Sequence, residues 1–282
     1  MHNYLSLVKF SHTIFALPFA IIGFLLGAKS INFDIPLKLP FLVLGCMVFA
    51  RTAAMSFNRY IDRDIDALNE RTKNREVPAG VVKPKQALGL TIISSILFIV
   101  CTYFINPLCF YLSPVALAVV LGYSYAKRFT SLCHFILGIG LALAPIGAYL
   151  AVTESFHIIP LLFSVAVLFW VSGFDIIYAL QDDEFDKEQN LKSIPTFLGR
   201  KNALNLSVLL HFVCSMSLLA AGVAMEASWI YFVGWILFSI ILFYQHKIIN
   251  PKDLSRVNLA FFTTNGVASV VFALLFIAEV FL

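Results

Sequence analysis

Long uninterrupted runs of hydrophobic residues, with polar residues gathered between them, dominate this chain. Eight such runs occur, at 10–28, 39–57, 86–126, 129–153, 155–174, 202–225, 227–246 and 257–278. A helix needs about 20 apolar residues to cross a bilayer, so the 41-residue run at 86–126 holds two crossings. Asn106-Pro107 is the natural break between them, because proline cannot continue a helical hydrogen-bond ladder. The pattern predicts an all-α polytopic membrane protein with nine transmembrane helices.

The composition supports a membrane protein and excludes two other classes. Of the 282 residues, 60% are hydrophobic and 13% charged, against about 45–50% and about 25% in soluble domains. The net charge is only +4, so there is no basic face for nucleic acid, and the expected partner is the lipid bilayer. No linker or low-complexity tract interrupts the runs, so we expect a single transmembrane domain over residues 1–282.

The basic residues predict the orientation of the chain. With a cytoplasmic N-terminus, 18 of the 20 Lys and Arg lie at cytoplasmic ends and loops, and only Lys29 and Lys38 lie outside. This bias satisfies the positive-inside rule. We therefore predict a multi-pass protein of the cell (inner) membrane with its C-terminus outside and its working face on the cytoplasmic side.

The acidic residues are concentrated in two short segments on that predicted cytoplasmic side. Eleven of the 16 Asp and Glu lie within 62–76 and 175–188. In the first segment Asn58, Asp62 and Asp66 recur at i, i+4 and i+8, which places them on one face of a helix continuing from the second span. The second segment repeats the pattern, with Asp182 and Asp186 continuing from the sixth span.

Such clustering of carboxylates requires neutralisation. Two carboxylates 5 Å apart repel by roughly 3 kcal/mol at an effective dielectric near 20, so a converging set must be held by protons, by Arg and Lys, or by a divalent metal. Oxygen ligands on two semi-rigid helices, with positions left for water or phosphate, favour Mg²⁺.

Two further ionisable residues have mainly apolar neighbours along the chain. Asp175 precedes Asp182 by seven residues, in the setting WVSGFDIIYAL, and an ionisable group at membrane depth is by default functional. Tyr178 follows it at i+3 on the same face. Arg51 lies inside the second span, on the face of Asn58, and needs an anionic partner from the protein or from a substrate.

These motifs resemble a known family. The stretch NRYIDRDIDALNERTKNREVPAG fits an NxxxDxxxD motif and DIIYALQDDEFD fits DxxYAxxDxxxD, both of the UbiA superfamily of intramembrane prenyltransferases. The sequence looks most like the 4-hydroxybenzoate polyprenyltransferase branch. KFSHTIFALPFA, YSYAKRFT and SIPTFLG extend the resemblance from the first span to the seventh. One residue departs from the pattern, because Arg59 stands where many members have Asp, which removes a third carboxylate.

The resemblance implies a fold, a reaction and a ligand set. The fold is nine transmembrane helices around a central cavity capped by cytoplasmic loops. The reaction is transfer of a polyprenyl group from polyprenyl diphosphate to a small hydroxyaromatic acid, in quinone biosynthesis. Mg²⁺ assists ionisation of the diphosphate, and its expected ligands are Asn58, Asp62, Asp66, Asp182 and Asp186. The expected diphosphate-binding residues are Arg71, Arg75, Lys127 and Arg128.

The same resemblance suggests roles around the allylic cation. Tyr123 and Tyr178 would stabilise it through their ring faces, and Asp175 would activate the acceptor phenol or remove the ring proton. Arg51 would hold the acceptor carboxylate or the diphosphate, and a choice between these stays open. Lys9 and His12, about one turn apart, are further candidates for this pocket.

Three alternatives bear on function. The acceptor could be a dihydroxynaphthoate for menaquinone rather than 4-hydroxybenzoate for ubiquinone, since both are small phenolic carboxylates. An ion-coupled carrier is a different class, but a carrier needs polar groups at the midplane with access from both sides. The CDP-alcohol phosphotransferases also use acidic helix ends and metal, but the DG followed by AR of their motif does not occur here.

Overall fold

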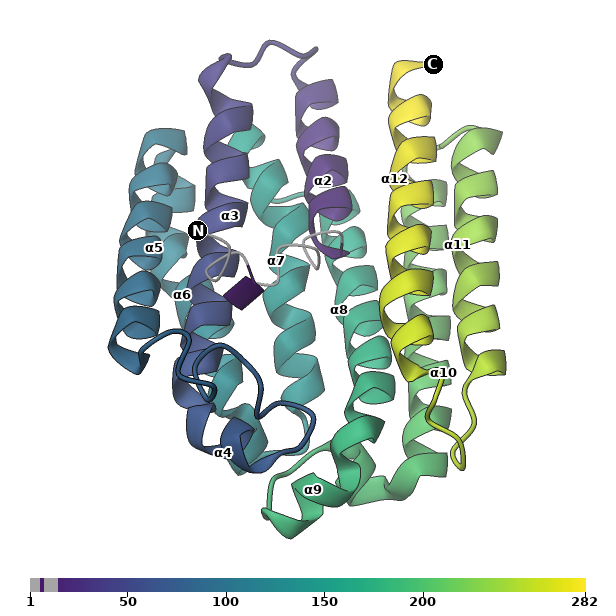
Figure 1. The fold of residues 1–282 in the computed structure, drawn as a ribbon. Helices are drawn as coiled ribbons and strands as arrows, with labels where there is room; N and C mark the ends of the chain where they lie inside the picture. The colour runs from purple at the N-terminus through teal and green to yellow at the C-terminus, as the bar shows by residue number, and fades with distance from the viewer. Residues whose placement is uncertain (1–5, 8–14) are drawn as a thin grey trace. The chain divides into compact units, whose positions relative to one another are not determined.

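Helices form the regular structure of the described chain. The computed structural model describes residues 6–7 and 15–282, and no strand occurs among these. A backbone in lipid must satisfy its own N–H and C=O groups, which a helix does within one segment. The long helices are α3 (Lys38–Ile61), α5 (Pro84–Ile105), α6 (Pro107–Phe129), α7 (Cys133–Thr153), α8 (Ile158–Ala179), α10 (Ile194–Ala224), α11 (Trp229–Ile248) and α12 (Asn265–Phe281) (Figure 1).

Shorter elements continue or connect these helices. They are α2 (Leu17–Ser30), α4 (Arg63–Leu68), the 3₁₀ turn η2 (Leu180–Asp182), α9 (Asp183–Glu188) and the π-helical segment η3 (Leu259–Thr264). Within residues 6–7 and 15–282, eight helices are long and apolar enough to cross a membrane, counting η3 with α12. The all-α polytopic class is thereby confirmed. Because α2 has 14 residues, the count of nine spans stays a prediction.

The break expected in the longest apolar run lies where proline places it. α5 ends at Ile105 and α6 begins at Pro107. The Asn106 side chain accepts a hydrogen bond from the Cys109 backbone N–H at 2.8 Å, which satisfies a donor that the first turn of a helix leaves without a partner. The sequence prediction of two spans within 86–126 is confirmed.

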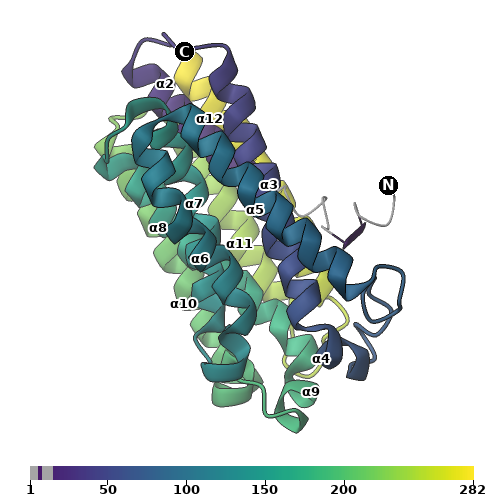
Figure 2. The ribbon, with the colours of Figure 1, turned by 90° about the vertical axis from the view of Figure 1, so that its left-hand side faces the viewer.

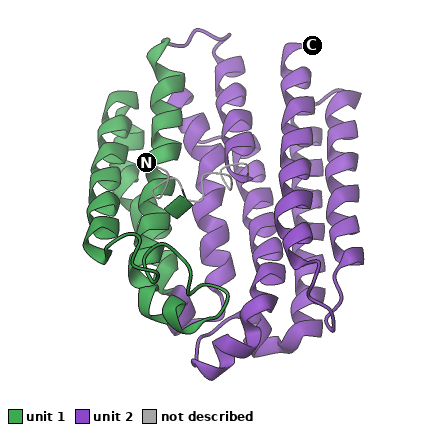
Figure 3. Cartoon of the chain, viewed as in Figure 1, with its two compact units in different colours: residues 1–13, 36–125 green, residues 14–35, 126–282 purple. Residues whose placement is uncertain are grey.

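Two compact units make up the chain (Figure 3). Unit 1 contains residues 1–13 and 36–125, and unit 2 contains 14–35 and 126–282. In unit 1, α3 and α5 lie side by side in both ribbon views (Figures 1 and 2). Ser56 and Thr91 join them through a hydroxyl–hydroxyl bond of 3.0 Å. A single domain over 1–282 stays a prediction.

Unit 2 has an aromatic core between its helices. Trp170, Phe163 and Phe19 are fully buried there, together with Phe238 and Phe272. Small residues allow the helices to approach, as in other membrane bundles. A Cβ on Gly138 of α7 would lie 2.5 Å from the Ser172 hydroxyl oxygen and 2.6 Å from the Leu168 carbonyl oxygen of α8. This close crossing brings the start of α7 against the end of α8.

Candidate active site

The first acidic motif lies at the end of α3 in unit 1. Asn58 donates from Nδ2 to Asp62 Oδ2 at 2.7 Å. α3 ends at Ile61 and α4 begins at Arg63, so the uninterrupted helix expected here is wrong. The helical bonding pattern still crosses the break, because the Asp62 N–H donates to the Asn58 carbonyl and the Asp66 N–H to the Asp62 carbonyl, at 2.9 and 2.7 Å. The structure therefore brings Asn58 and Asp62 together, as the spacing predicts.

Asp66, the last residue of this motif, is buried with one oxygen satisfied. Its Oδ1 accepts from Arg75 Nη1 at 2.7 Å. Its Oδ2 is buried and has no hydrogen-bond partner among the described residues. Burying a carboxylate oxygen without a partner costs free energy, so this atom is suited to a cation that binds from outside the chain.

Arg59 replaces the Asp of the family pattern and is buried beside the motif. Its Nη1 donates to Asn58 Oδ1 at 3.3 Å, and its Nε lies 3.8 Å from Glu76 Oε2. Glu76 in turn accepts from the Ser6 hydroxyl at 2.5 Å. The structure thus places a guanidinium, neutralised by Glu76, where a third carboxylate was expected from other members.

Two other predicted substrate-binding cations of unit 1 are Arg51 and Arg71. Arg51 is half-buried within α3, and the half-buried Tyr123 of α6 is within electrostatic range of it. Arg71 is exposed in the loop after α4, where its backbone N–H donates to Asn69 Oδ1 at 2.9 Å. Arg75, in the same loop, contacts the motif carboxylate of Asp66.

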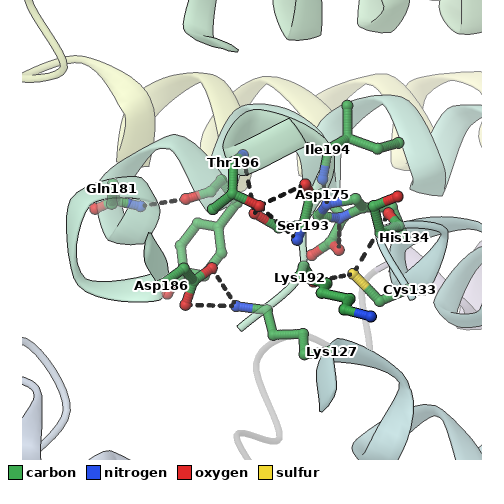
Figure 4. Close-up of polar contacts among 12 residues, drawn as sticks. Lys127, Cys133, His134, Asp175, Gln181, Asp186, Lys192, Ser193, Ile194 and Thr196 are labelled. Atoms are coloured by element: carbon green, nitrogen blue, oxygen red, sulfur yellow. Dashed lines mark hydrogen bonds and ion pairs between the residues drawn. The ribbon is translucent and has the colours of Figure 1, made fainter. Parts of the chain in front are cut away.

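The second acidic motif lies in unit 2, where α8 passes through η2 into α9. The helix again changes at the motif, and Asp182 has the dihedral angles of the junction, φ −112° and ψ 5°. Asp182 and Asp186 are both buried. Lys127 Nζ lies 3.0 Å from Asp186 Oδ2 and 3.4 Å from Oδ1 (Figure 4). Asp182 is within electrostatic range of both groups, so the structure brings Asp182 and Asp186 together with one predicted cation, Lys127.

Other charged residues around this motif have structural partners. Arg200 makes a two-pronged contact with Asp183 at 2.8 and 2.7 Å, and a further one with Glu184 at 2.9 Å. This arrangement anchors α9 to the start of α10. Arg128 is exposed at the end of α6. The acidic residues of this segment therefore have two roles. Asp182 and Asp186 are buried motif residues, and Asp183 and Glu184 hold α9 through Arg200.

Asp175 has a partner that the sequence prediction missed. Its Oδ2 lies 2.7 Å from His134 Nδ1, and His134 is fully buried at the start of α7 (Figure 4). The Asp175 side chain is 23% exposed. A histidine at the edge of an apolar run was the available signal, because ionisable groups at membrane depth are costly. Its partner lies 41 residues away, and no local spacing indicates such a contact.

The Tyr178 ring is held against another aromatic ring. Its centroid lies 4.2 Å from that of Phe261, in the π-helical segment η3. Asn265 supports that segment by donating from Nδ2 to the carbonyls of Ala260 and Phe261, at 3.0 and 2.8 Å. Tyr178 thus lies one helical turn from Asp175 with its ring packed. Lys9 and His12 lie outside the described residues.

Each motif by itself resembles an open, partial ligand set rather than a complete protein cage for a metal. Among residues 6–7 and 15–282 there is no group of three or more His, Cys, Asp or Glu arranged to hold a metal ion. Each motif contributes two carboxylates instead. Mg²⁺ is commonly bound in this way, through one or two carboxylates with water and substrate phosphate completing its shell. The buried, half-satisfied Asp66 carboxylate fits such an ion.

The fold and the two motifs define a membrane-embedded helical protein with acidic helix ends, and comparison with known proteins gives its family. The profile of the UbiA prenyltransferase family matches residues 16–267. The chain therefore belongs to this family and is a prenyltransferase of membranes. The resemblance noted in the sequence is confirmed.

Relatives and solved structures agree with this assignment. The chain is 30% identical to a 4-hydroxybenzoate octaprenyltransferase of Enterobacter sp. (strain 638), over 79% of this chain and 76% of that protein. It is 30% identical to one of Aliivibrio fischeri, over 82% and 80%. The apo structure of a UbiA homologue from Aeropyrum pernix K1 matches with a TM-score of 0.85 and 32% identity, covering 95% of this chain and 98% of that one.

A more distant structure shares the fold. The UbiA homologue from Archaeoglobus fulgidus bound to DMAPP and Mg²⁺ matches with a TM-score of 0.77 and 22% identity, covering 99% of each chain. At this identity the likeness concerns the fold alone.

Proposed function

We propose that this protein transfers a polyprenyl group from polyprenyl diphosphate to a small hydroxyaromatic acid of the 4-hydroxybenzoate type, in quinone biosynthesis. The observation that carries the proposal is that each acidic motif contains a buried carboxylate bonded to a cation, Asp66 to Arg75 and Asp186 to Lys127. Relatives at 30% identity are named 4-hydroxybenzoate octaprenyltransferases. Acidic motifs with adjacent cations suit a diphosphate leaving group.

Mg²⁺ is the cofactor we propose for both motifs. Asn58, Asp62 and Asp66 would hold it in unit 1, and Asp182 and Asp186 in unit 2. When bound, the ion would neutralise charge on the diphosphate as the leaving group departs. The oxygen-only donor set and the unsatisfied Asp66 Oδ2 support this choice over softer metals.

In this proposal Arg75 and Lys127 contact motif carboxylates before the substrate binds and diphosphate oxygens afterwards. Arg75 and Lys127 neutralise Asp66 and Asp186, at 2.7 and 3.0 Å. Once a metal balances those carboxylates, the same side chains would donate charge-assisted hydrogen bonds to diphosphate oxygens. Arg71 and Arg128 are exposed and would add long-range attraction for the anionic substrate.

The bond changes follow from the leaving group. The allylic C–O bond breaks and its electron pair leaves with the diphosphate, and the ring carbon of the acceptor then bonds to the allylic carbon. Tyr123 and Tyr178 would stabilise the cation through their ring faces. Asp175 would accept a proton, either from the acceptor phenol or from the alkylated ring carbon. Arg51 would bind the acceptor carboxylate or the diphosphate. Helices at lipid depth would exclude water.

The cellular setting belongs to the proposal as well. The protein would lie in the cell (inner) membrane with its N-terminus in the cytoplasm, its C-terminus outside and its active site facing the cytoplasm. The distribution of 18 of 20 basic residues supports this orientation. The donor is water-soluble at its diphosphate end and lipid-soluble along its chain, so a site at the membrane surface suits it.

One experiment tests the reaction and identifies the acceptor. Membranes containing the protein are given one labelled prenyl diphosphate and a panel of aromatic acids that includes 4-hydroxybenzoate and a dihydroxynaphthoate, and products are identified by mass spectrometry. We expect one C-prenylated hydroxyaromatic acid. A dihydroxynaphthoate product would assign the enzyme to menaquinone rather than ubiquinone. Absence of any prenylated product, with ion-coupled uptake in a parallel transport assay, would favour a carrier.

A further inference from the structure

His134 connects three helices of unit 2 at the proposed site of proton transfer. It is fully buried at the start of α7. Nδ1 lies 2.7 Å from Asp175 Oδ2 on α8, and Nε2 accepts from the Ile194 backbone N–H of α10 at 3.2 Å (Figure 4). Both ring nitrogens are therefore engaged, one by a carboxylate and one by the main chain.

The Ile194 contact decides which nitrogen of His134 carries the proton. Ile194 is the first residue of α10, where a backbone N–H has no acceptor within its own helix. A backbone N–H can only donate, so Nε2 must be the acceptor and carries no proton. The ring is then neutral with its proton on Nδ1, and it donates to Asp175.

The start of α10 is itself held in place. Ser193 is the N-cap, and its backbone N–H donates to Thr196 Oγ1 at 2.9 Å while its hydroxyl accepts from the Thr196 N–H at 3.3 Å. This capping box fixes the direction of the Ile194 N–H. The Lys192 N–H, two residues before Ile194, donates to the Lys127 carbonyl at 2.7 Å. The segment that sets the tautomer of His134 is thus tied to the end of α6.

We infer that His134 is a positioning residue for Asp175, and that it holds Oδ2 so that Oδ1 is the oxygen that receives the proton from the acceptor. This inference rests on the proposed function. The Asp175 side chain retains 23% exposure, whereas His134 has none. The Asp175 side chain is therefore partly open to a substrate and the imidazole is not, which excludes direct contact of His134 with the reacting atoms.

The proton balance agrees with this assignment. When the ring carbon has bonded to the allylic carbon, its C–H bond breaks, the electron pair restores the aromatic ring, and the proton passes to Asp175 Oδ1. His134 keeps its Nδ1 proton throughout, because Nε2 is occupied by the Ile194 N–H. The histidine orients the base without exchanging a proton with the substrate.

Two assays on the full-length protein separate this role from a structural one. The first measures prenyl transfer to the acceptor that the wild type uses. The second measures C–O cleavage alone, as exchange of ¹⁸O between bridging and non-bridging positions of the prenyl diphosphate. The ratio of transfer to exchange reports steps after ionisation, so a change in the diphosphate half of the site lowers both rates and leaves the ratio unchanged.

His134→Phe and His134→Ala remove the donor to Asp175, whereas His134→Asn keeps a side-chain N–H in reach of it. A general base contributes about 10²–10⁴-fold, and we expect loss of its positioning to lower the ratio by about tenfold or more in the Phe and Ala variants. The Asn variant should recover most of the ratio. The KM for prenyl diphosphate should remain at the wild-type value in all three.

His211→Phe, compared with His134→Phe, is the matched control. His211 is also a buried histidine of unit 2, with Nδ1 2.8 Å from His246 Nε2 and Nε2 3.2 Å from the Trp170 carbonyl oxygen. Its replacement removes two comparable side-chain bonds, which join α10 to α11 and to α8 in the same unit. We expect a lower unfolding temperature with a wild-type ratio.

Each outcome bears on the inference. A wild-type ratio in a folded His134→Phe or His134→Ala variant, or a ratio lowered equally by His211→Phe, overturns it. If neither the Phe nor the Ala variant folds, the Asn variant decides: a wild-type ratio supports the inference and a tenfold lower one refutes it. Failure of the proposed function is distinct, because the wild type would then prenylate none of the aromatic acids.

Discussion

At the scale of single residues, the two motifs share one arrangement. Each contains a buried carboxylate that the spacing of acids predicts and a cation that contacts it, Arg75 at Asp66 and Lys127 at Asp186. The sequence predicted these four residues and left open whether Arg and Lys neutralise the carboxylates, but it did not indicate which cation contacts which carboxylate. Pairing within the protein was not predictable, since Arg75 lies nine residues after Asp66 and Lys127 lies 59 before Asp186.

Asp66→Asn tests the metal proposal at its best-defined atom. Replacing a charged ligand should lower kcat by roughly 10²–10³-fold, the usual effect of losing one electrostatic contact to a transition state. Transfer is measured with a labelled prenyl diphosphate across a Mg²⁺ titration. Asp64→Asn is the control, because Asp64 lies in the same short helix with a side chain that is 82% exposed. Normal turnover by Asp66→Asn would contradict the proposed ligand set.

Lys127→Met tests whether this lysine donates a hydrogen bond to the diphosphate of the substrate. Loss of a charge-assisted hydrogen bond worth about 1.5–3 kcal/mol should raise the KM for prenyl diphosphate by roughly 10–100-fold. The steady-state KM for each substrate is measured separately, and the KM for the aromatic acid should change less. Lys187→Met, an exposed lysine of α9, should behave like the wild type. An unchanged KM for the diphosphate would limit Lys127 to neutralising Asp186.

At the scale of helices, close crossings determine where the polar side chains meet. Gly138→Val places a branched side chain where a Cβ alone would lie 2.5 Å from Ser172 Oγ. Overpacking should lower the free energy of unfolding by about 1–3 kcal/mol, measured by thermal or denaturant unfolding in detergent.

A second glycine of the same helix provides the comparison. A Cβ on Gly147 of α7 would meet nothing within 4 Å. Gly147→Ala should therefore leave the protein as stable as the wild type or raise its stability by about 0.5–1 kcal/mol, since alanine favours a helix interior. If both substitutions lowered the free energy of unfolding equally, the close contact of α7 with α8 at Gly138 would not be the cause of the destabilisation.

At the scale of the whole molecule, the topology can be tested directly. Cysteine is introduced at Glu70, in a predicted cytoplasmic loop, and at Glu226, in a predicted outer loop, and both positions are exposed. A membrane-impermeant maleimide applied to intact cells should label the Glu226→Cys variant and not the Glu70→Cys variant. The reverse pattern would invert the proposed orientation.

Metal dependence is a property of the complete enzyme. Excess EDTA should stop prenyl transfer, and Mg²⁺ should restore it better than Ca²⁺, because two carboxylates per motif leave the remaining positions to water and phosphate. Initial rates before and after chelation provide the measurement. Undiminished transfer in excess EDTA would remove Mg²⁺ from the mechanism.

The sequence by itself determined the all-α membrane class, the break at Asn106-Pro107 and the two acidic motifs. These features are local, because the hydrophobic length needed to cross lipid and the conformational limits of proline act on consecutive residues. Only the tertiary structure decided that Arg200 anchors Asp183, that Arg59 pairs with Glu76, and that His134 contacts Asp175. Those contacts depend on how helices pack, and packing joins residues whose separation along the chain carries no periodic signal.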